Sequence, residues 1–430
     1  MVKLTAKFSF MEEYKLSDIA EVRTGPFGSQ LHNEDYVSTG TPIVTVEHLG
    51  NRRFSKQNLP LVSDDDKKRL SKYLLQEGDI VFSRVGSVDR CSYVTSAEND
   101  WLFSGRCLRV RCGNNCHPLF LYYYFCKESV KQYIKSIAVG ATMPSINTKL
   151  MAEIPILLPK LEEQRCIADI LSSFDDKIEL NRRINDNLEQ QAQALFKAWF
   201  VDFEPFRDGE FVNSVLGSTP KELPITYIEN IPHNIESGKR PKGGATLIGV
   251  PSIGAENIKG LGYYDYSKTK YIPEEYAQTI KKGKINGYEL LIYKDGGKPG
   301  YFIPNFTIFG EGFPFNEMYI NEHVFLLDLM DCGYNVFAYF YMQTPYIMNQ
   351  LNSIGGKAAI PGINTKDVEC LPIYSNESPY VKKFGEIVLP FIKTILSNSL
   401  ENAKQAKVRD TLLPKLRTGE LKINEIKPEK

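Results

Sequence analysis

Residues 144–149 read Pro-Ser-Ile-Asn-Thr-Lys, and residues 361–366 read Pro-Gly-Ile-Asn-Thr-Lys, 217 positions further on. The pair Ile154-Pro155 recurs at the same offset as Leu371-Pro372. Earlier in each half the matches are looser and their offset drifts, as insertions in surface loops would cause. Self-similarity at a fixed period is typical of a duplicated architecture. The sequence therefore predicts one unit of about 200 residues that is used twice.

A long helix is predicted between the two halves. From Ile167 to Trp199, apolar residues and asparagines recur at alternating steps of four and three, and residues 162–199 contain no Gly or Pro. A mean period of 3.5 residues indicates a coiled-coil helix, here about 57 Å long at 1.5 Å per residue. The same pattern 217 residues later predicts a second helix that packs on the first. The predicted helix-pair contacts are Ile167, Leu171, Phe174, Ile178, Leu188, Leu195, Phe384, Val388, Phe391, Ile395 and Leu412.

Polar residues interrupt both predicted helices at matching places. Asn181 and Asn185 of the first helix correspond to Asn398 and Asn402 of the second. A buried Asn at such a position fixes the register of a helix pair, because a slipped pairing leaves its amide unpaired. The alternative is that these asparagines are solvated where the helices splay apart. Pro390 and Pro414 additionally predict a kink or a break in the second helix.

The segments before each helix are short β-rich runs between Gly, Asn and Asp clusters, followed by a helical run. The strands are expected near 42–46, 79–83, 288–293 and 322–327, and the helical runs near 118–137 and 336–351. The predicted fold class is α+β: two similar mixed α/β domains separated by two long helices, with a pseudo-two-fold internal repeat. The predicted boundaries are 1–159 for the first domain, 160–204 for the first long helix, 205–376 for the second domain, and 377–430 for the second helix and tail.

Composition argues against several functions. Lys+Arg and Asp+Glu are both 52 among 430 residues, so binding to a polyanion must depend on local patches. No phosphate-binding G-x4-G-K-[ST] loop and no glycine-rich cofactor turn is present. With five histidines and no hydrolase-like spacing, the chain is predicted not to be an enzyme. The absence of long apolar runs and of a signal-like start predicts a cytoplasmic protein with no membrane partner.

Two clusters have a functional and a structural interpretation. Cys107, Cys112, Cys116 and Cys126 lie close to His117, but their spacings are not those of common zinc modules, so buried thiols are favoured over a metal site. The run Tyr122-Tyr123-Tyr124-Phe125 could offer stacking faces for single strands. Core packing is favoured, because consecutive aromatics on a helix point in several directions.

Basic residues gather in glycine-flanked loops at 83–87, 237–244 and 294–298. Between His233 and Gly300 there are 11 Lys and Arg against 7 Asp and Glu, whereas residues 301–333 hold five acids and no Lys or Arg. Residues 103–135 hold six bases against one acid. Glycine permits close approach of a phosphate to backbone N–H groups and flanking cations. A basic glycine loop alone is more often a solvated turn, but two of these loops occupy corresponding places in the repeat.

Several phrases resemble specificity subunits of type I restriction-modification systems. Residues 194–203, Ala-Leu-Phe-Lys-Ala-Trp-Phe-Val-Asp-Phe, resemble the end of their central conserved helix, and Thr411–Leu421 resembles their C-terminal conserved region. Gly28-Ser29, Pro251–Ile258 and the two Ile-Asn-Thr-Lys segments are also similar to those subunits. The resemblance covers essentially the whole chain, with the parts in the same order.

The resemblance implies two target-recognition domains that bind the halves of a bipartite double-stranded DNA sequence, and an antiparallel helix pair as a spacer. It implies docking of two modification subunits, which carry S-adenosylmethionine and methylate adenine, and of two restriction subunits, which use ATP and Mg. This subunit would hold no metal, cofactor or catalytic residue. The candidate DNA-binding residues are Ser29, Arg84, Ser87, Arg90, Arg106, Lys239, Arg240, Lys242, Lys294, Lys298 and Lys357.

Three other interpretations remain open at this point. The chain could be a coiled-coil scaffold whose domains bind proteins. It could be the recognition subunit of a related methylation-linked defence system, or an enzyme with an unfamiliar site around Cys107 and His117.

Overall fold

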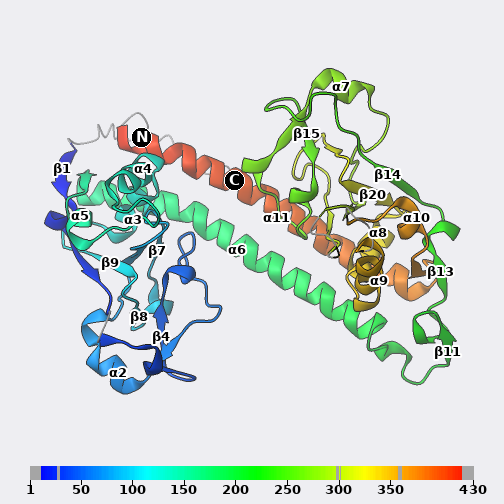
Figure 1. The fold of residues 1–430 in the computed structure, drawn as a ribbon, viewed down its shortest axis with the longest axis horizontal. Helices are drawn as coiled ribbons and strands as arrows, with labels where there is room; N and C mark the ends of the chain where they lie inside the picture. The colour runs from blue at the N-terminus through cyan, green and yellow to red at the C-terminus, as the bar shows by residue number, and fades with distance from the viewer. Residues whose placement is uncertain (1–10, 27–29, 297–299, 301, 357–360, 419–430) are drawn as a thin grey trace, which may run out of the picture. The chain divides into compact units, whose positions relative to one another are not determined.

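The computed structural model describes residues 11–26, 30–296, 300, 302–356 and 361–418, and the chain divides into two compact units (Figure 1). Unit 1 takes its described residues from the first 176 positions and from position 406 onward, and unit 2 comprises residues 177–405. Two helices of 40 residues each contribute to both units: α6 (Leu161–Phe200) and α11 (Pro379–Thr418). The two predicted long helices are therefore confirmed.

Unit 1 contains a four-stranded antiparallel sheet in the order β2-β9-β6-β7 and a smaller one in the order β3-β5-β4-β8, in which β4 and β8 are parallel. β1 pairs separately with β10, the strand that leads into α6. The strands are β1 (Glu12–Lys15), β2 (Ala20–Thr24), β3 (Tyr36–Val37), β4 (Thr41–Val44), β5 (Leu61–Val62), β6 (Ile80–Ser83), β7 (Cys91–Tyr93), β8 (Leu102–Phe103), β9 (Cys107–Cys112) and β10 (Pro155–Leu158). The helices are α1 (Leu16–Ile19), α2 (Asp64–Arg69), α3 (Pro118–Cys126), α4 (Glu128–Ile137) and α5 (Thr148–Ala152).

Unit 2 repeats this topology. Its sheets have the orders β14-β20-β17-β18, β16-β15-β19 and β13-β21, and β15 and β19 are again parallel. The described part of unit 1 has no counterpart to the hairpin β11–β12 (Phe211–Ser214 and Gly217–Pro220). The other strands are β13 (Ile225–Tyr227), β14 (Asn234–Ser237), β15 (Val250–Ile253), β16 (Lys270–Ile272), β17 (Leu290–Tyr293), β18 (Phe306–Ile308), β19 (Tyr319–Ile320), β20 (Val324–Asp328) and β21 (Pro372–Tyr374). The helices are α7 (Glu274–Thr279), α8 (Cys332–Met342), α9 (Pro345–Gly355) and α10 (Thr365–Glu369).

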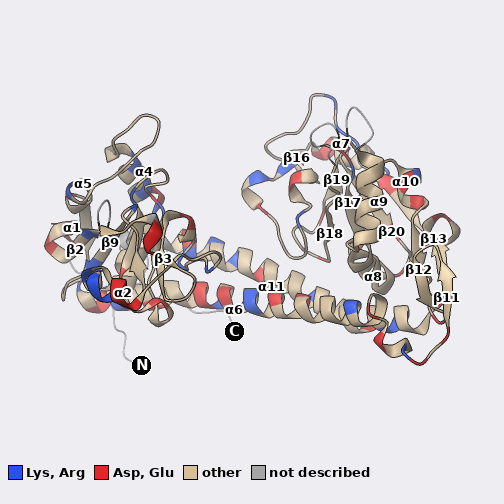
Figure 2. Cartoon of the chain, turned by 60° about the horizontal axis from the view of Figure 1, so that its bottom comes forward, with Lys and Arg blue, Asp and Glu red and all other residues tan. Residues whose placement is uncertain are grey.

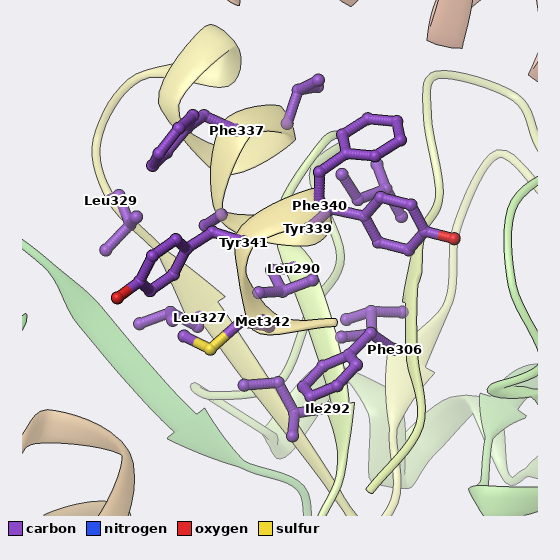
Figure 3. Packing of buried hydrophobic residues seen from close by; sticks show 14 of the residues in the cluster. Leu290, Ile292, Phe306, Leu327, Leu329, Phe337, Tyr339, Phe340, Tyr341 and Met342 are labelled. Atoms are coloured by element: carbon purple, nitrogen blue, oxygen red, sulfur yellow. The ribbon is translucent and has the colours of Figure 1, made fainter. Parts of the chain in front are cut away.

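Each core forms where a largely apolar helix covers the four-stranded sheet. In unit 2, α8 lies over β17, β18 and β20, and Figure 3 shows Phe337, Tyr339 and Phe340 of α8 with Leu290 and Phe306 of the sheet. In unit 1, α3 has the same place, and Tyr122–Phe125 are all buried. The predicted core role of that aromatic run is confirmed. Burial of such a side chain stabilises the fold by about 1.5–3 kcal/mol.

The helical run predicted at 118–137 is two helices, α3 and α4, and the run at 336–351 falls in two more, α8 and α9. Extended backbone at Lys127 separates the first pair, with φ −64° and ψ 135°. Thr344, also extended, precedes Pro345 at the start of α9. Proline restricts the residue before it to extended conformations, which explains the second break.

The helix pair is antiparallel, and its matched asparagines bond across it. In unit 2, Asn181 is 1% exposed and donates to Glu401 Oε2 at 2.8 Å and to Asn402 Oδ1 at 3.0 Å. Asn398 donates to Asn185 Oδ1 at 2.8 Å. Asn181 is buried, whereas Asn185, Asn398 and Asn402 are half-buried. All four bond across the pair, and these bonds hold only in one register, as the register interpretation predicted.

The break predicted in the second helix does not occur, because α11 is continuous through Pro390 and Pro414. Pro390 is exposed, so the carbonyl of Glu386 that loses its helical partner can bond water. The buried Val388 and Ile392 on either side hold the helix against unit 2.

The predicted contacts of the helix pair are buried or half-buried. Ile167, Leu171, Ile178, Phe384, Val388 and Ile395 are buried, and Phe174, Leu188, Leu195, Phe391 and Leu412 are half-buried. The buried face of α11 is wider than a two-residue seam, since Leu396 also packs on its own unit's core. No helix in the described residues is long and apolar enough to cross a membrane.

Candidate nucleic-acid interface

In unit 1, the repeated Pro-x-Ile-Asn-Thr-Lys phrase holds the basic loop that follows β6. Gly86 N donates to Pro144 O at 2.8 Å, and Ile146 N donates to Arg84 O at 2.9 Å. Asn147 then caps α5, because its Oδ1 accepts from Leu150 N at 2.9 Å. The phrase therefore fixes the backbone of the Arg84 loop against the start of a helix.

Unit 2 repeats this arrangement with different residues. Gly296 N donates to Pro361 O at 2.9 Å, and Ile363 N donates to Lys294 O at 2.8 Å. Asn364 caps α10 through Asp367 N at 3.1 Å. The phrase that predicted the internal repeat thus has the same structural role in both units: it holds a glycine loop that carries a cation.

The predicted basic residues of unit 1 gather on two adjoining turns, β6–β7 and β8–β9. Arg84 N donates to Arg106 O at 2.8 Å, and the Arg84 guanidinium donates to Gly105 O at 3.1 Å. Arg90 closes the first turn, since its N–H donates to Ser87 O at 3.0 Å. Ser87, Arg90 and Arg106 are exposed and Arg84 is half-buried. The structure therefore brings these four candidates together.

The two predicted basic loops of unit 2 also meet. Lys294 Nζ donates to Ser237 Oγ at 3.0 Å and lies 4.9 Å from the centre of the Phe325 ring. Arg240 pairs with Glu322 on the β19–β20 turn at 3.6 Å. Lys239 and Lys242 are exposed in the same loop as Arg240. Ser29, Lys298 and Lys357 lie outside the described residues, so their placement stays a prediction.

The two units present different groups on this common scaffold. His323 of unit 2 stands 217 residues after Arg106 of unit 1 and occupies the equivalent place on its turn. His323 Nδ1 contacts Asp295 Oδ1 at 2.5 Å, and Asp295 follows Lys294. Unit 1 thus offers two arginines where unit 2 offers a lysine, a carboxylate and an imidazole. Such a difference suits two units that bind different base sequences.

The base-rich stretch 103–135 is less positive at the surface than its sequence indicates. Arg109 is 1% exposed, and its guanidinium pairs with Glu21 at 2.6 Å. Burial lowers the pKa of Arg109. Arg111 pairs with Asp79 at 2.6 Å, and this bond raises the pKa of Arg111. Lys135 pairs with Asp89 of the β6–β7 loop at 3.1 Å, so three of the six bases balance acids of the sheet and its loops.

Sequence inspection missed Lys281 and Lys282, which are exposed directly after α7. The segment that carries them touches the Arg240 loop: a Cβ built on Gly283 would lie 3.4 Å from Gly238 Cα. Figure 2 shows blue basic segments in the loops around α7 and β16. The only sequence signal for this contact was the glycine at 238 and at 283, since close approach of two backbones often requires Gly.

The cysteine-rich segment of unit 1 is a set of packed thiols. Cys107 is buried, and burial raises its pKa to about 12. Cys112 Sγ lies 3.3 Å from Cys116 Sγ, and burial lowers the pKa of the adjacent His117. Among the residues that the structure describes, no group of three or more His, Cys, Asp or Glu side chains is arranged to hold a metal ion.

Comparison with known proteins gives consistent matches. Residues 9–190 match the sequence model of the family described as type I restriction modification DNA specificity domain. The chain is 27% identical to the type I restriction enzyme MjaIX specificity subunit of Methanocaldococcus jannaschii, over 96% of this chain and 94% of that protein. It is 26% identical to the HindI specificity subunit of Haemophilus influenzae, over 95% of this chain and 99% of that protein.

A solved structure shares the fold. The crystal structure of a type I restriction-modification system S subunit from M. genitalium aligns over 96% of this chain and 98% of its own, with a TM-score of 0.61 and 17% sequence identity.

Proposed function

Because this chain belongs to the specificity subunits of type I restriction-modification systems, we propose that each of its two units binds one half of a bipartite double-stranded DNA target. The observation that carries the proposal is that each Pro-x-Ile-Asn-Thr-Lys phrase holds a glycine loop by the same pair of backbone hydrogen bonds. In both units the same backbone bonds hold a glycine loop with Arg84 or Lys294 beside a second turn. Phosphates can meet the loop cations and N–H groups, and the differing side chains can meet base edges.

The helix pair is proposed to set the spacing between the half-sites. Each helix has 40 residues, which corresponds to about 60 Å of α-helix. Half-sites read from one face of B-DNA lie about 34 Å apart, within reach of such an element. The asparagine bonds support this role, because they permit one register only.

The remaining chemistry is proposed to reside in partner subunits. We expect two modification subunits, which carry S-adenosylmethionine, and two restriction subunits, which use ATP and Mg, to dock on this chain. The chain itself is proposed to be non-catalytic and to act in the cytoplasm, where its DNA target is. A target adenine must leave the base stack to be methylated, so the modification subunits would work beside each bound half-site.

The test is salt-dependent DNA binding by the complex reconstituted with its modification subunits. Methylation-sensitive sequencing of the source genome first supplies the target duplex. The slope of log K against log salt changes by about 0.9 for each DNA phosphate that the protein no longer neutralises. We therefore expect Arg106→Ala, in unit 1, and Lys239→Ala, in unit 2, each to flatten the slope by about that amount.

The matched control is Lys221→Ala. Lys221 is also exposed, but it pairs with Glu210 beside the β11–β12 hairpin and belongs to neither basic loop. It should leave the slope unchanged. Slopes that do not respond to either loop variant would reject these loops as the DNA contacts.

A further inference from the structure

The loop that follows β14 ends in the two most exposed large apolar side chains of the described residues. Leu247 is 91% exposed and Ile248 is 82% exposed. Single exposed apolar side chains are ordinary, but two adjacent ones at a loop tip form a patch that would gain from burial in a partner. We call this pair the apolar tip.

The apolar tip sits on a fixed backbone. Thr246 and Tyr271 exchange backbone hydrogen bonds of 2.8 and 3.2 Å, and Thr246 Oγ1 donates to Ile248 O at 2.8 Å. Gly249 follows with φ 129°, and a Cβ on it would lie 2.2 Å from Ile272 O. These bonds hold the tip to β16 immediately before β15 begins. Binding a partner through the tip would therefore cost little conformational entropy of the backbone.

Unit 1 shows that the fold does not need apolar residues at this place. Gly40 of unit 1 matches Gly249, with φ 154° and a Cβ position 2.1 Å from Val62 O. The two residues before Gly40 are Ser38 and Thr39, which are exposed. The same turn therefore carries a polar pair in one unit and an apolar pair in the other, which points to a role specific to unit 2.

Lysines lie in the loop that carries the apolar tip and in a segment that touches this loop. Lys239 and Lys242 lie in the same loop, and Lys281 and Lys282 follow the segment that touches this loop at Gly238. None of these four lysines pairs with an acid among the described residues. The acids that contact these segments have other partners: Glu322 pairs with Arg240, and Glu236 accepts a hydrogen bond from Gly283 N. An exposed apolar pair on a loop with unpaired lysines fits a partner that is anionic outside and apolar inside. A DNA duplex has both properties, because its phosphates lie outside and its stacked bases inside.

We propose, on the basis of the function proposed above, that Leu247 and Ile248 insert between base pairs of the half-site that unit 2 binds and bend the duplex there. Leu and Ile are among the residues that proteins insert into base steps from the minor groove, and such wedges bend DNA by about 20–90°. The lysines of this loop and of the segment that touches it contact neighbouring phosphates. Unit 1, with Ser38 and Thr39 in this place, does not insert.

The test uses the complex reconstituted with its modification subunits and a target duplex with a fluorophore at each end. The variant Leu247→Ser/Ile248→Thr gives the apolar tip the residues that the same turn carries in unit 1. We expect it to lose the bend of the second half-site, seen as lower energy transfer, and to bind about tenfold more weakly. Its salt slope stays that of the unchanged chain, because the lysines that neutralise the phosphates are all retained.

Two controls separate the outcomes. Leu247→Met/Ile248→Met keeps the tip apolar and should retain the bend, whereas Val215→Ser removes an exposed apolar side chain of the β11–β12 hairpin and should change nothing. An unchanged bend in the Ser/Thr variant overturns the wedge. Loss of the modification subunits from that variant also overturns it, since the tip would then be a protein contact. Failure of the unchanged chain to bind its target would instead reject the proposed function.

Discussion

The side chain of Asp175 joins four segments of unit 1, so its replacement by Asn tests how the helix pair is held there. The Asp175 carboxylate accepts a hydrogen bond of 2.6 Å from the Tyr123 hydroxyl on α3 and contacts the Arg409 guanidinium of α11. Arg52 lies 4.0 Å away and also pairs with Asp176 at 2.9 Å. Asp175 is 11% exposed at its side chain, so these contacts are poorly screened by water.

The magnitude follows from the contacts that remain. Two unit charges about 4 Å apart interact by about 4 kcal/mol at an effective dielectric constant of 20. In the Asp175→Asn variant, Arg409 keeps its contact with Asp410, Arg52 keeps Asp176, and the Asn oxygen can still accept from Tyr123. We therefore expect about half of the interaction to be removed, or about 2 kcal/mol of unfolding free energy. For a unit of about 200 residues this lowers Tm by about 4–8 °C.

A double-mutant cycle with Arg409→Met isolates the pair. The change in unfolding free energy is measured by denaturant titration for Asp175→Asn, Arg409→Met and the double variant, and a coupling of about 1–2 kcal/mol is expected. Asp176→Asn is the matched control, because Asp176 is 57% exposed and its loss should cost under about 1 kcal/mol. A coupling below about 0.5 kcal/mol, or an equal cost for Asp176→Asn, would refute the reasoning.

Three further predictions concern stability. Asn185→Ala leaves the half-buried Asn398 amide without its partner and should lower the unfolding free energy by about 1 kcal/mol in a denaturant titration. Asn187→Ala, on the exposed face, should stay within about 0.5 kcal/mol, and equal effects would contradict the register role. Gly385→Ala places a Cβ 2.8 Å from the Gly333 backbone, and this overlap should cost about 1–3 kcal/mol of unfolding free energy. Tm should therefore fall, although Ala has the better helix propensity. An unchanged Tm would disprove the close approach. Burial alone would raise the pKa of Glu256, but its ion pair with Lys270 outweighs burial and holds the pKa below its usual value. The pair therefore stabilises the fold fully above about pH 4.3, the ordinary pKa of Glu. This stabilisation is lost as the pH falls through the lower pKa of the folded state. Glu256→Gln should remove that part of the acid-induced loss of stability, and an unaltered pH profile would count against the pair.

The sequence predicted the architecture well, because both governing signals are local. The 3.5-residue period placed the first helix at 162–199, within a residue of its ends at 161 and 200. The repeated Pro-x-Ile-Asn-Thr-Lys phrase predicted the matching topology of the two units. The continuity of α11 could not be predicted, because what decides it is that Pro390 faces solvent while its neighbours pack on unit 2.

The candidate interface was predicted only in part. The cations of the glycine loops were identified, but their grouping depends on bonds across the chain, such as Arg84 N to Arg106 O. Lys281 and Lys282 join the Arg240 loop through a backbone contact between glycines 45 positions apart, at 238 and 283. The sequence could not show that Arg109 and Arg111 are ion-paired, because their partners, Glu21 and Asp79, lie on distant segments of the chain.

The most direct measurement is a hydroxyl-radical footprint of the reconstituted complex on its target duplex. If the two units each bind one half-site, two protected segments appear about one helical turn apart, and Arg106→Ala weakens protection of one while Lys239→Ala weakens the other. One continuous protected segment, or equal weakening of both segments by either substitution, would contradict the assignment of one half-site to each unit.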